Sequence, residues 1–445
     1  MQSASLNLLQ RTTCPHCWSS FGPEAVLWIS AHADLLGDPR LGPEQPQRFL
    51  PTRFTIEGDA IDARGFVSQA LACPKCHLPV PRVLLEVEPT FISILGSPAC
   101  GKSFFLTALT WHLRRLADQF ALVFADADTV SNRSLNEYEE SLFLNSRADE
   151  LIPLADLIRK TELQGDLYDT VMFGNQTVSY PRPFLFTVRP TDHHPKYTAA
   201  RVGRVLCLYD NAGEHFRPGQ DTTGSPVTRH MAQARLLLFL FDPTQDQRFQ
   251  KLCRERISDG DQAFEGRTSR QELVLDEVAA RVRRVLGLPQ DAKHTQPLIV
   301  VLTKLDAWTG LLADKDWSDP FLLHAGLTGV DLERIEARSR AVRELMLQGC
   351  AELVRSAEAF ARDVIYVPVS ALGKTPLSAG PGNARTIRPR DIRPLWVTVP
   401  LLYGMCRWMP GLVPAVKRLR RHDALSQAAK VTKTSREPAG RTVFD

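Results

Sequence analysis

One stretch of eight residues constrains this chain more than any other, the sequence Gly-Ser-Pro-Ala-Cys-Gly-Lys-Ser at positions 96–103. It matches the G-x-x-x-x-G-K-[ST] phosphate-binding loop at every required position. The apolar run at 91–95 predicts a buried strand before the loop, and the run at 104–116 has apolar residues at helical spacing after it. A strand, a glycine loop and a helix in this order are the context in which the pattern binds a nucleotide phosphate.

The residues of the loop have separate expected roles. Backbone N–H groups of the loop and the positive end of the following helix would cradle a β-phosphate. Lys102 would reach the β- and γ-phosphates, and the Ser103 hydroxyl would ligate Mg²⁺. The expected nucleotide contacts are Gly96, Ser97, Pro98, Ala99, Cys100, Gly101, Lys102, Ser103 and Phe104. For Cys100, a small residue tolerated at a variable position is favoured over a redox sensor.

The composition sets only broad bounds. The 445 residues are enough for two or three domains, and the 44% hydrophobic content is that of an ordinary globular protein. No basic start is followed by an apolar core, and no run of about 18 apolar residues occurs, so we expect neither a secretory signal nor a transmembrane helix. Four of the nine cysteines form C-x-x-C pairs, which favours metal binding in a reducing, cytoplasmic setting over disulfides.

The two C-x-x-C pairs predict a metal site near the start of the chain. Cys14 and Cys17 form the first pair, and Cys73 and Cys76 form the second after a gap of 55 residues. Two such knuckles that face each other supply the four thiolates of a tetrahedral zinc site. A module this small is expected to need the metal in order to fold. A redox dithiol pair and unrelated buried cysteines are the alternatives.

The segment between the two pairs must fold back as a loop or hairpin, with residues 49–56 and 65–72 as its expected strands. His16 and His77 stand beside the cysteines, but we do not expect them to be ligands. The pattern leaves the function of the module open. Such modules bind nucleic acid, bind protein or cap a neighbouring domain.

A long insertion, at about 120–183, follows the expected first helix. Nucleotide-dependent switches lie at this point of phosphate-loop proteins. A threonine of the switch should ligate Mg²⁺, and Thr161 is the candidate, with Thr170, Thr177 and Thr191 as rivals.

A second phosphate-directed motif follows the insertion. Residues 184–188 and 205–209 predict a pair of strands, and the second strand ends in a D-x-x-G motif that runs from Asp210 to Gly213. An aspartate at the tip of an apolar strand holds Mg²⁺ through water. The glycine of such a motif brings its N–H to the γ-phosphate.

The base is indicated by a third motif. An apolar strand at 297–302 leads into Thr303, Lys304 and Asp306, which match [NT]-K-x-D. In this pattern the aspartate accepts the N1–H and the 2-amino hydrogens of guanine, neither of which adenine offers. The stem of the lysine packs on the ring. The motif therefore predicts a guanine nucleotide.

The last predicted strand, at 364–369, delivers Ser370, Ala371 and Leu372, whose backbone N–H groups would cover O6 of guanine. A single amphipathic helical stretch at 334–360 precedes it. Strands that alternate with helices predict an α/β fold with a doubly wound, mostly parallel sheet and helices on both faces. Its ligand is expected at the carboxyl edge of the sheet.

In combination, the four motifs resemble those of the P-loop GTPases of the Ras-like and translation-factor superclass, over roughly residues 90–375. The chain also looks like the bacterial double-GTPase (DO-GTPase) family of conflict systems. That likeness rests on the cysteine knuckles, on residues 71–82, on Lys-Thr-Glu at 160–162 and on Gln-Gly-Asp at 164–166. It implies a switch or assembly subunit that binds GTP/GDP, Mg²⁺ and Zn²⁺, and that works with protein partners encoded nearby.

The sequence departs from the GTPase pattern after Gly213. Glu214 stands where many GTPases place a glutamine that orients the attacking water, and its carboxylate would repel the γ-phosphate. His215 is the alternative positioning group. Hydrolysis is therefore expected to be slow or to need a partner, and Lys102, Glu214 and His215 are the candidate catalytic residues. An ATPase with a degenerate base site and a nucleic-acid- or protein-binding adaptor with a structural nucleotide site remain the alternatives.

These observations divide the chain into a zinc-ribbon-like module at 1–89, a GTPase domain at 90–378, and a docking segment with a basic tail at 379–445. Residues 388–402 are expected to pack on the nucleotide domain, with a docking patch as the alternative. Positions 417–445 hold eight Lys/Arg against three Asp/Glu, so this end is expected to be disordered. An acidic membrane surface or a nucleic acid is its alternative partner.

Overall fold

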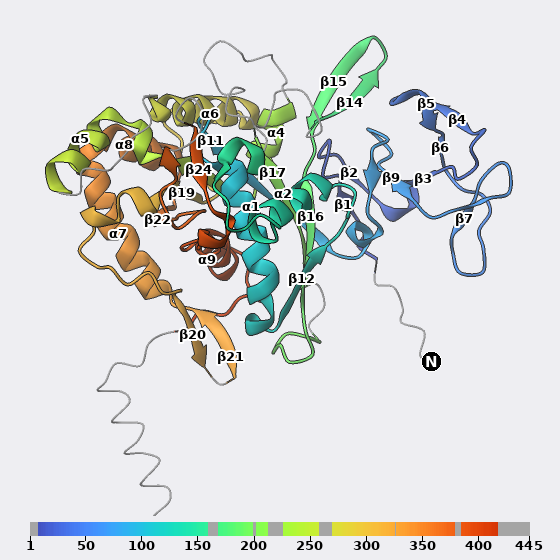
Figure 1. Ribbon diagram of the computed structural model, residues 1–445. Coiled ribbons are helices and arrows are strands. Elements are labelled where there is room, and N and C mark those ends of the chain that lie inside the picture. Colours follow the sequence, from blue (N-terminus) through green and yellow to red (C-terminus); the bar gives the residue numbers. More distant parts are fainter. Residues whose placement is uncertain are drawn as a thin grey trace, which may run out of the picture.

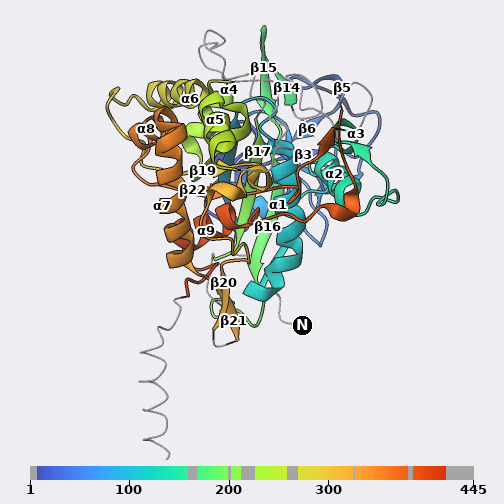
Figure 2. The ribbon, with the colours of Figure 1, turned by 60° about the vertical axis from the view of Figure 1, so that its left-hand side comes forward.

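The computed structural model is built around one large central sheet with helices on it and a small module beside it (Figures 1 and 2). The module, blue in Figure 1, is formed by the N-terminal residues. The structure describes residues 8–158, 168–198, 202–211, 226–257, 269–324, 326–378 and 384–416.

The central sheet is mixed. Its strands are β11 (Glu88–Gly96), β12 (Leu122–Asp126), β16 (Phe184–Pro190), β17 (Arg204–Asp210), β18 (Leu236–Phe241), β19 (Leu298–Leu302) and β22 (Val364–Pro368). They are arranged in the order β12-β16-β17-β11-β18-β19-β22. The five strands from β17 to β22 are parallel, whereas β16 and β12 are antiparallel to their neighbours. Every residue of β18 and β19 is buried, as is usual for parallel strands covered on both faces.

Helices cover both faces of this sheet. The core on one face contains residues of α1 (Lys102–Leu116) and α9 (Val399–Trp408). The core on the other face draws on α4 (Pro226–Gln233), α5 (Gln247–Arg256), α6 (Gln271–Leu286), α7 (Leu332–Gly349) and α8 (Ala351–Phe360). The single helical stretch predicted at 334–360 is thus two helices. They part at Cys350, whose φ of −142° is not helical. None of the helices in the described ranges is long and apolar enough to cross a membrane.

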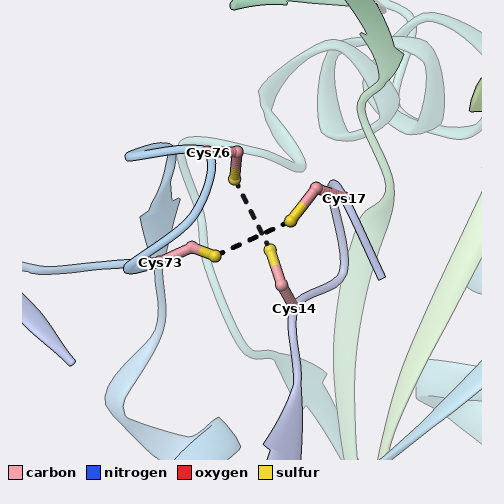
Figure 3. Close-up of side chains that lie close together, drawn as sticks. All are labelled: Cys14, Cys17, Cys73 and Cys76. Carbon is pink, nitrogen blue, oxygen red and sulfur yellow. Dashed lines mark hydrogen bonds between the residues drawn. The ribbon is translucent and has the colours of Figure 1, made fainter. Parts of the chain in front are cut away.

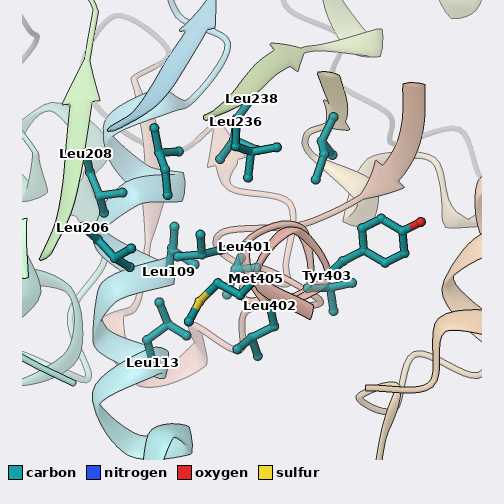
Figure 4. Packing of buried hydrophobic residues seen from close by; sticks show 14 of the residues in the cluster. Leu109, Leu113, Leu206, Leu208, Leu236, Leu238, Leu401, Leu402, Tyr403 and Met405 are labelled. Atoms are coloured by element: carbon teal, nitrogen blue, oxygen red, sulfur yellow. The ribbon is translucent and has the colours of Figure 1, made fainter. Parts of the chain in front are cut away.

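The last helix, α9, belongs to the core of the sheet. Leu401, Leu402 and Met405 are at most 2% exposed. They lie in one cluster with Leu109 of α1 and Leu206 of β17 (Figure 4). The apolar part of the C-terminal segment therefore packs against the sheet, in agreement with the packing expected for it.

The segment between α1 and β16 adds a strand that the sequence prediction missed. Residues 122–126 form β12, the edge strand of the central sheet. The helix α2 (Arg133–Phe143) lies on α1, where Arg114 bonds to Asp126 at 2.7 Å and to Glu139 at 3.2 Å. The strands β14 (Tyr168–Phe173) and β15 (Gln176–Pro181) form a projecting hairpin (Figure 1). The same segment contains the short strand β13 (Ile152–Pro153) and the one-turn helix α3 (Leu154–Leu157). Four further strands lie later in the chain: β20 (Phe321–His324), β21 (Leu327–Val330), β23 (Leu377–Ser378) and β24 (Arg385–Ile387).

The N-terminal module consists of very short strands. They are β1 (Thr12–Thr13), β2 (Ser20–Phe21), β3 (Leu27–Ile29), β4 (Leu36–Asp38), β5 (Gly42–Pro46), β6 (Arg48–Phe49), β7 (Ala60–Ile61), β8 (Val67–Ser68), β9 (Leu71–Ala72) and β10 (Pro79–Val80). The strands expected at 49–56 and 65–72 are therefore reduced to two-residue pieces. The buried residues of the module share one cluster with Phe91, Leu185 and Tyr209 of the central sheet. The module is thus packed directly on the sheet.

Candidate nucleotide and metal sites

The predicted phosphate loop forms a tight turn between β11 and α1. Gly96 has a φ of +149°, and a Cβ there would lie 2.4 Å from the carbonyl oxygen of Leu240, so the position requires glycine. Gly101 precedes α1 with a φ of +92°, a left-handed conformation that also favours glycine. Pro98 and Ala99 form the turn between the two glycines, and Phe104 lies in the first turn of α1.

Lys102 folds back over the loop that precedes it. Its Nζ donates to the carbonyl oxygens of Gly96 at 3.0 Å and Ser97 at 2.9 Å, and the residue is only 7% exposed. The third neighbour of the ammonium is Cys100 Sγ at 3.9 Å, a weak acceptor. The ammonium group is therefore held in the centre of the loop by two strong acceptors and one weak one.

Two side chains inside the loop are fully buried, Ser97 and Cys100. Among the described residues, Ser97 Oγ has no hydrogen-bond partner. An unsatisfied buried hydroxyl is costly and fits a site that is completed by a polar ligand. Burial raises the pKa of the Cys100 thiol despite the nearby Lys102. A raised pKa lowers the fraction of thiolate, on which the reactivity of a cysteine depends.

The predicted magnesium ligands lie in contact with each other. Ser103 Oγ donates to Asp210 Oδ2 at 2.8 Å. The parallel register of β11 and β17, which pairs Ile94 with Asp210, brings the two residues to the same edge of the sheet. A hydroxyl oxygen and a carboxylate oxygen are ligands that Mg²⁺ prefers, so this pair fits the ion.

Asn211 is a residue whose role the sequence analysis missed. It is fully buried, and its Nδ2 donates to the carbonyl oxygen of Ile94 at 2.9 Å and to Ser93 Oγ at 3.1 Å. These bonds fix the chain directly after Asp210 to the strand that carries the phosphate loop. The signal in the sequence was an amide residue at the end of an apolar strand, which is too common to be informative alone.

The two motifs predicted to bind the base also meet. The carboxylate of Asp306 accepts hydrogen bonds from the hydroxyl groups of Ser370 and, at 2.9 Å, Thr375. Ser370 Oγ in turn accepts from the backbone N–H of Gly373 at 2.7 Å. Ala371 and Leu372 follow Ser370 in the same turn. The carboxylate is therefore held in a fixed orientation by residues of the last motif.

Lys304 has a partner that the sequence analysis also missed. Its Nζ lies 2.7 Å from Oδ2 of Asp242, a fully buried residue directly after β18. The backbone of Lys304 is left-handed, with a φ of +53°, and Thr303 before it is buried. The ion pair fixes the course of the lysine stem across the edge of the sheet. The signal in the sequence for Asp242 was the position of this residue directly after an apolar strand.

Four of the predicted site residues lie outside the described residues, namely Thr161, Gly213, Glu214 and His215. Of the rival threonines, Thr170 and Thr177 lie on the projecting hairpin of β14 and β15. Thr191 bonds to the carbonyl oxygen of Ala121 at 3.0 Å, at the edge of the sheet opposite Asp210.

The four predicted zinc ligands form one buried cluster (Figure 3). The Sγ atoms of Cys14 and Cys76 are 3.7 Å apart, as are those of Cys17 and Cys73, and all four lie within 4.8 Å of one another. Sulfurs around zinc, with Zn–S bonds of about 2.3 Å, have tetrahedral edges of about 3.8 Å. Burial raises the pKa of the Cys14 thiol, and a bound metal cation would favour its thiolate. The donor set and its size fit zinc.

The two histidines beside the cysteines bond to the protein. His16 Nε2 lies 3.0 Å from the carbonyl oxygen of Pro79 and donates to it, and burial lowers the pKa of His16. His77 Nδ1 lies 2.8 Å from Oδ2 of Asp38. Both rings are thus used to hold the knuckles in place, and the expectation that neither histidine is a ligand agrees with the geometry.

Comparison with known proteins finds one curated relative of note. No family model matches the sequence. A protein of Mycolicibacterium smegmatis described as "Putative ESX-1 scaffolding and assembly protein SaeC" is 26% identical over 275 residues. The alignment covers 56% of this chain and 63% of that protein, so the chain spans less than two thirds of its relative.

Solved structures that match are GTP-binding domains at low identity. They include Sup35 with GDP, which is 13% identical over 64% of this chain and 38% of its own, with a TM-score of 0.21. The GTP-bound GTPase-like domain of S. cerevisiae Ski7 is 13% identical over 64% and 43%, with a TM-score of 0.25. The SRb-GTP/SRX complex of Chaetomium thermophilum is 13% identical over 65% and 93%, with a TM-score of 0.24. TM-scores this low do not establish a shared fold.

Proposed function

We propose that this protein is a guanine-nucleotide switch with Mg²⁺-dependent GTP hydrolysis that is slow or stimulated by a partner. One observation carries the proposal. The phosphate loop, Asp210, Asp306 and Ser370 all follow parallel strands of one sheet, and direct bonds join Ser103 to Asp210 and Ser370 to Asp306. Ligands of open α/β sheets bind at this carboxyl edge.

The contacts of Lys102 support phosphate binding. Two of its donors are fixed by carbonyl oxygens of the loop, and the remaining contact among the described residues is with the thiol of Cys100 at 3.9 Å. A phosphate oxygen is a much stronger acceptor than a thiol and would replace it. A Mg²⁺ ion would supply the neutralising charge between the β- and γ-phosphates. Ser103 and Asp210 are already together where they would hold it.

The contacts of Asp306 support recognition of guanine. Ser370 and Thr375 orient its carboxylate, whose oxygens would accept the N1–H and 2-amino hydrogens of the base. The bond between Lys304 and Asp242 would hold the lysine stem against the ring. For hydrolysis, Glu214 and His215 remain the candidates to orient water, and the carboxylate at Glu214 is the reason to expect slow turnover.

The cellular role proposed here is assembly with protein partners. The description of the mycobacterial relative as a scaffolding and assembly protein supports it over the aligned 56% of the chain. So does the likeness of the knuckles and motifs to the double-GTPase family of multi-gene conflict systems. Structural zinc held by Cys14, Cys17, Cys73 and Cys76 would stabilise the N-terminal module for such contacts.

The phosphate site is tested by Lys102→Ala in the full chain, with binding of labelled GTP as the readout. Loss of a charge-assisted bond of about 1.5–3 kcal/mol should weaken binding by about 10- to 100-fold. Lys315→Ala, which removes a lysine that bonds only to the exposed turn at Thr309 O, is the matched control and should leave affinity unchanged. Equal affinity of Lys102→Ala and the parent would overturn the phosphate assignment.

The base site is tested by Asp306→Asn. An amide in place of the carboxylate donates to a carbonyl at C2, so the variant should lose its preference for GTP over ATP and prefer xanthosine triphosphate. Asp192→Asn, whose side chain is 73% exposed, is the control. Binding competition among the three nucleotides is the measurement. The guanine assignment fails when the parent binds ATP and GTP equally, or when Asp306→Asn retains the GTP preference.

A further inference from the structure

The first cysteine knuckle is bonded to the strand that ends in Asp210. Tyr209 is fully buried on the face of β17 that meets the N-terminal module. Its hydroxyl donates to the carbonyl oxygen of Pro15 at 2.5 Å and accepts from Trp18 Nε1 at 3.0 Å. Pro15 lies between Cys14 and Cys17, so one hydroxyl joins the metal knuckle to the residue next to the predicted Mg²⁺ ligand.

A buried polar group lies directly beneath this contact. His230 of α4 is fully buried, and its Nε2 lies 3.0 Å from Ser93 Oγ. Ser93 Oγ also accepts from Asn211 Nδ2 at 3.1 Å. The ring of His230 lies 4.6 Å from that of Tyr209 and 5.5 Å from that of Trp18, between centroids. The strand β11, the end of β17 and the helix α4 are therefore tied together under the knuckle.

The hairpin of β14 and β15 lies beside the first knuckle. Asp169 Oδ2 lies 3.6 Å from His16 Nδ1, and Asp169 also bonds to Arg182 at 2.6 Å. Further along the hairpin, the backbone N–H of Met172 donates to the carbonyl oxygen of Arg40 at 2.8 Å. The hairpin is thus bonded to the N-terminal module at Arg40.

We propose that the Cys₄ metal centre and the nucleotide site are energetically coupled through Tyr209. The inference rests on the proposed binding of nucleotide with Mg²⁺ at Ser103 and Asp210. Successive residues of a strand point to opposite faces, so Asp210 faces Ser103 while Tyr209 faces the knuckle. A change in the position of Asp210 on binding Mg²⁺ must change the geometry of the Tyr209 hydroxyl. That hydroxyl is fully buried and bonded to both Pro15 and Trp18.

Coupling of this kind is reciprocal. Nucleotide should change the affinity for zinc by the same factor by which zinc changes the affinity for nucleotide. A typical coupling free energy corresponds to a factor of about 5 to 150. The conformation of the knuckle, and with it the surface of the N-terminal module, would then depend on which nucleotide is bound.

The test uses the full chain loaded with zinc. The extent of zinc release to a chelating dye at equilibrium is compared without nucleotide, with GDP and Mg²⁺, and with a non-hydrolysable GTP analogue and Mg²⁺. We expect at least a 5-fold difference among these states in the parent. Tyr209→Phe removes one oxygen and keeps the ring, so it should still bind both ligands while the difference falls below about 2-fold.

The matched control is Tyr366→Phe. Tyr366 is also buried in the central sheet, and its hydroxyl donates to Glu358 Oε1 at 3.2 Å, away from the knuckle. This variant should retain the full nucleotide dependence of zinc release. The proposal is overturned when zinc release by the parent ignores a nucleotide that it binds, or when Tyr209→Phe shows the same coupling as the parent.

Failure of nucleotide binding is detected separately, by titration of the parent with labelled GTP. If the parent binds no nucleotide, hydrogen exchange still tests whether the metal centre affects the packing around Tyr209. Removal of zinc should raise exchange in α4 but not in β19, and Tyr209→Phe alone should raise it in α4 to a smaller extent. When the parent binds no nucleotide, exchange in α4 that is the same with and without zinc overturns the mechanical link between the metal centre and the packing around Tyr209.

Discussion

The central sheet and the N-terminal module bury their interiors by different means. The strands β18 and β19 place six and five consecutive residues in the core, all fully buried. Most strands of the module have two residues, and four cysteines stand at its centre. The apolar cluster of the module also contains Phe91, Leu185 and Tyr209 of the sheet, so the sheet supplies part of the module's hydrophobic core. The module therefore depends on its metal and on the sheet, whereas the core around β18 and β19 contains no described residue of the module.

Removal of the metal should have the largest effect of the changes predicted here, and it should act on the module rather than on the sheet. Zinc binding in small cysteine modules contributes about 10–16 kcal/mol to folding. Cys73→Ser should therefore unfold the module, while the helices on the sheet keep their circular dichroism signal and the amides of β18 and β19 stay protected. Circular dichroism and hydrogen exchange by mass spectrometry measure the two effects.

Cys406→Ser is the control, because Cys406 lies in α9 away from the cluster and is partly exposed. It should leave zinc content and module protection unchanged. Loss of the sheet together with the module in Cys73→Ser would contradict the independence of the sheet.

A cavity in the sheet core should produce the opposite pattern. Leu401 is fully buried between the sheet and α1, so Leu401→Ala should lower the free energy of unfolding by about 2–5 kcal/mol. Zinc affinity should stay the same. Denaturant unfolding and zinc titration are the measurements. Leu377→Ala, at a residue that is 49% exposed, should change stability by less than about 0.5 kcal/mol. A loss of zinc affinity in Leu401→Ala would show that zinc binding in the module depends on the packing of the sheet core at Leu401.

The sequence predicted the sheet well because its strands carry their own signal. The runs that became β11, β19 and β22 are largely apolar, and each leads into a motif. The strand β12 was missed for the opposite reason. It is a five-residue edge strand with one neighbour, and Val123 within it is 49% exposed. A short, half-exposed run has no pattern that separates it from a loop.

The candidate site was predictable in its motifs but not in its supporting contacts. Ser103 and Asp210 meet because two motif-bearing strands are parallel neighbours. Asp242 and Asn211 gain their roles only from the position of residues distant in sequence, which no local pattern encodes. The bond between Tyr209 and Pro15 joins residues 194 positions apart.

The smallest expected effect concerns the bond that holds the second knuckle. Asp38 is buried and accepts hydrogen bonds from the backbone N–H groups of Arg40 at 2.8 Å and Leu41 at 3.0 Å, with His77 Nδ1 2.8 Å away. Asp38→Asn keeps the shape but weakens these charge-assisted bonds. It should cost about 1–3 kcal/mol in the module and speed zinc release by about 10-fold, with the stability of the sheet unchanged.

Asp34→Asn is the matched control for this measurement, since its side chain is 70% exposed in the same module. It should release zinc at the rate of the parent. Release from Asp38→Asn at that same rate would mean that the sulfurs alone hold the second knuckle. The contact between Asp38 and His77 would then contribute little, and the module would depend almost entirely on its metal. A variant that lowers the stability of the sheet instead would show that Asp38 supports the sheet as well as the module.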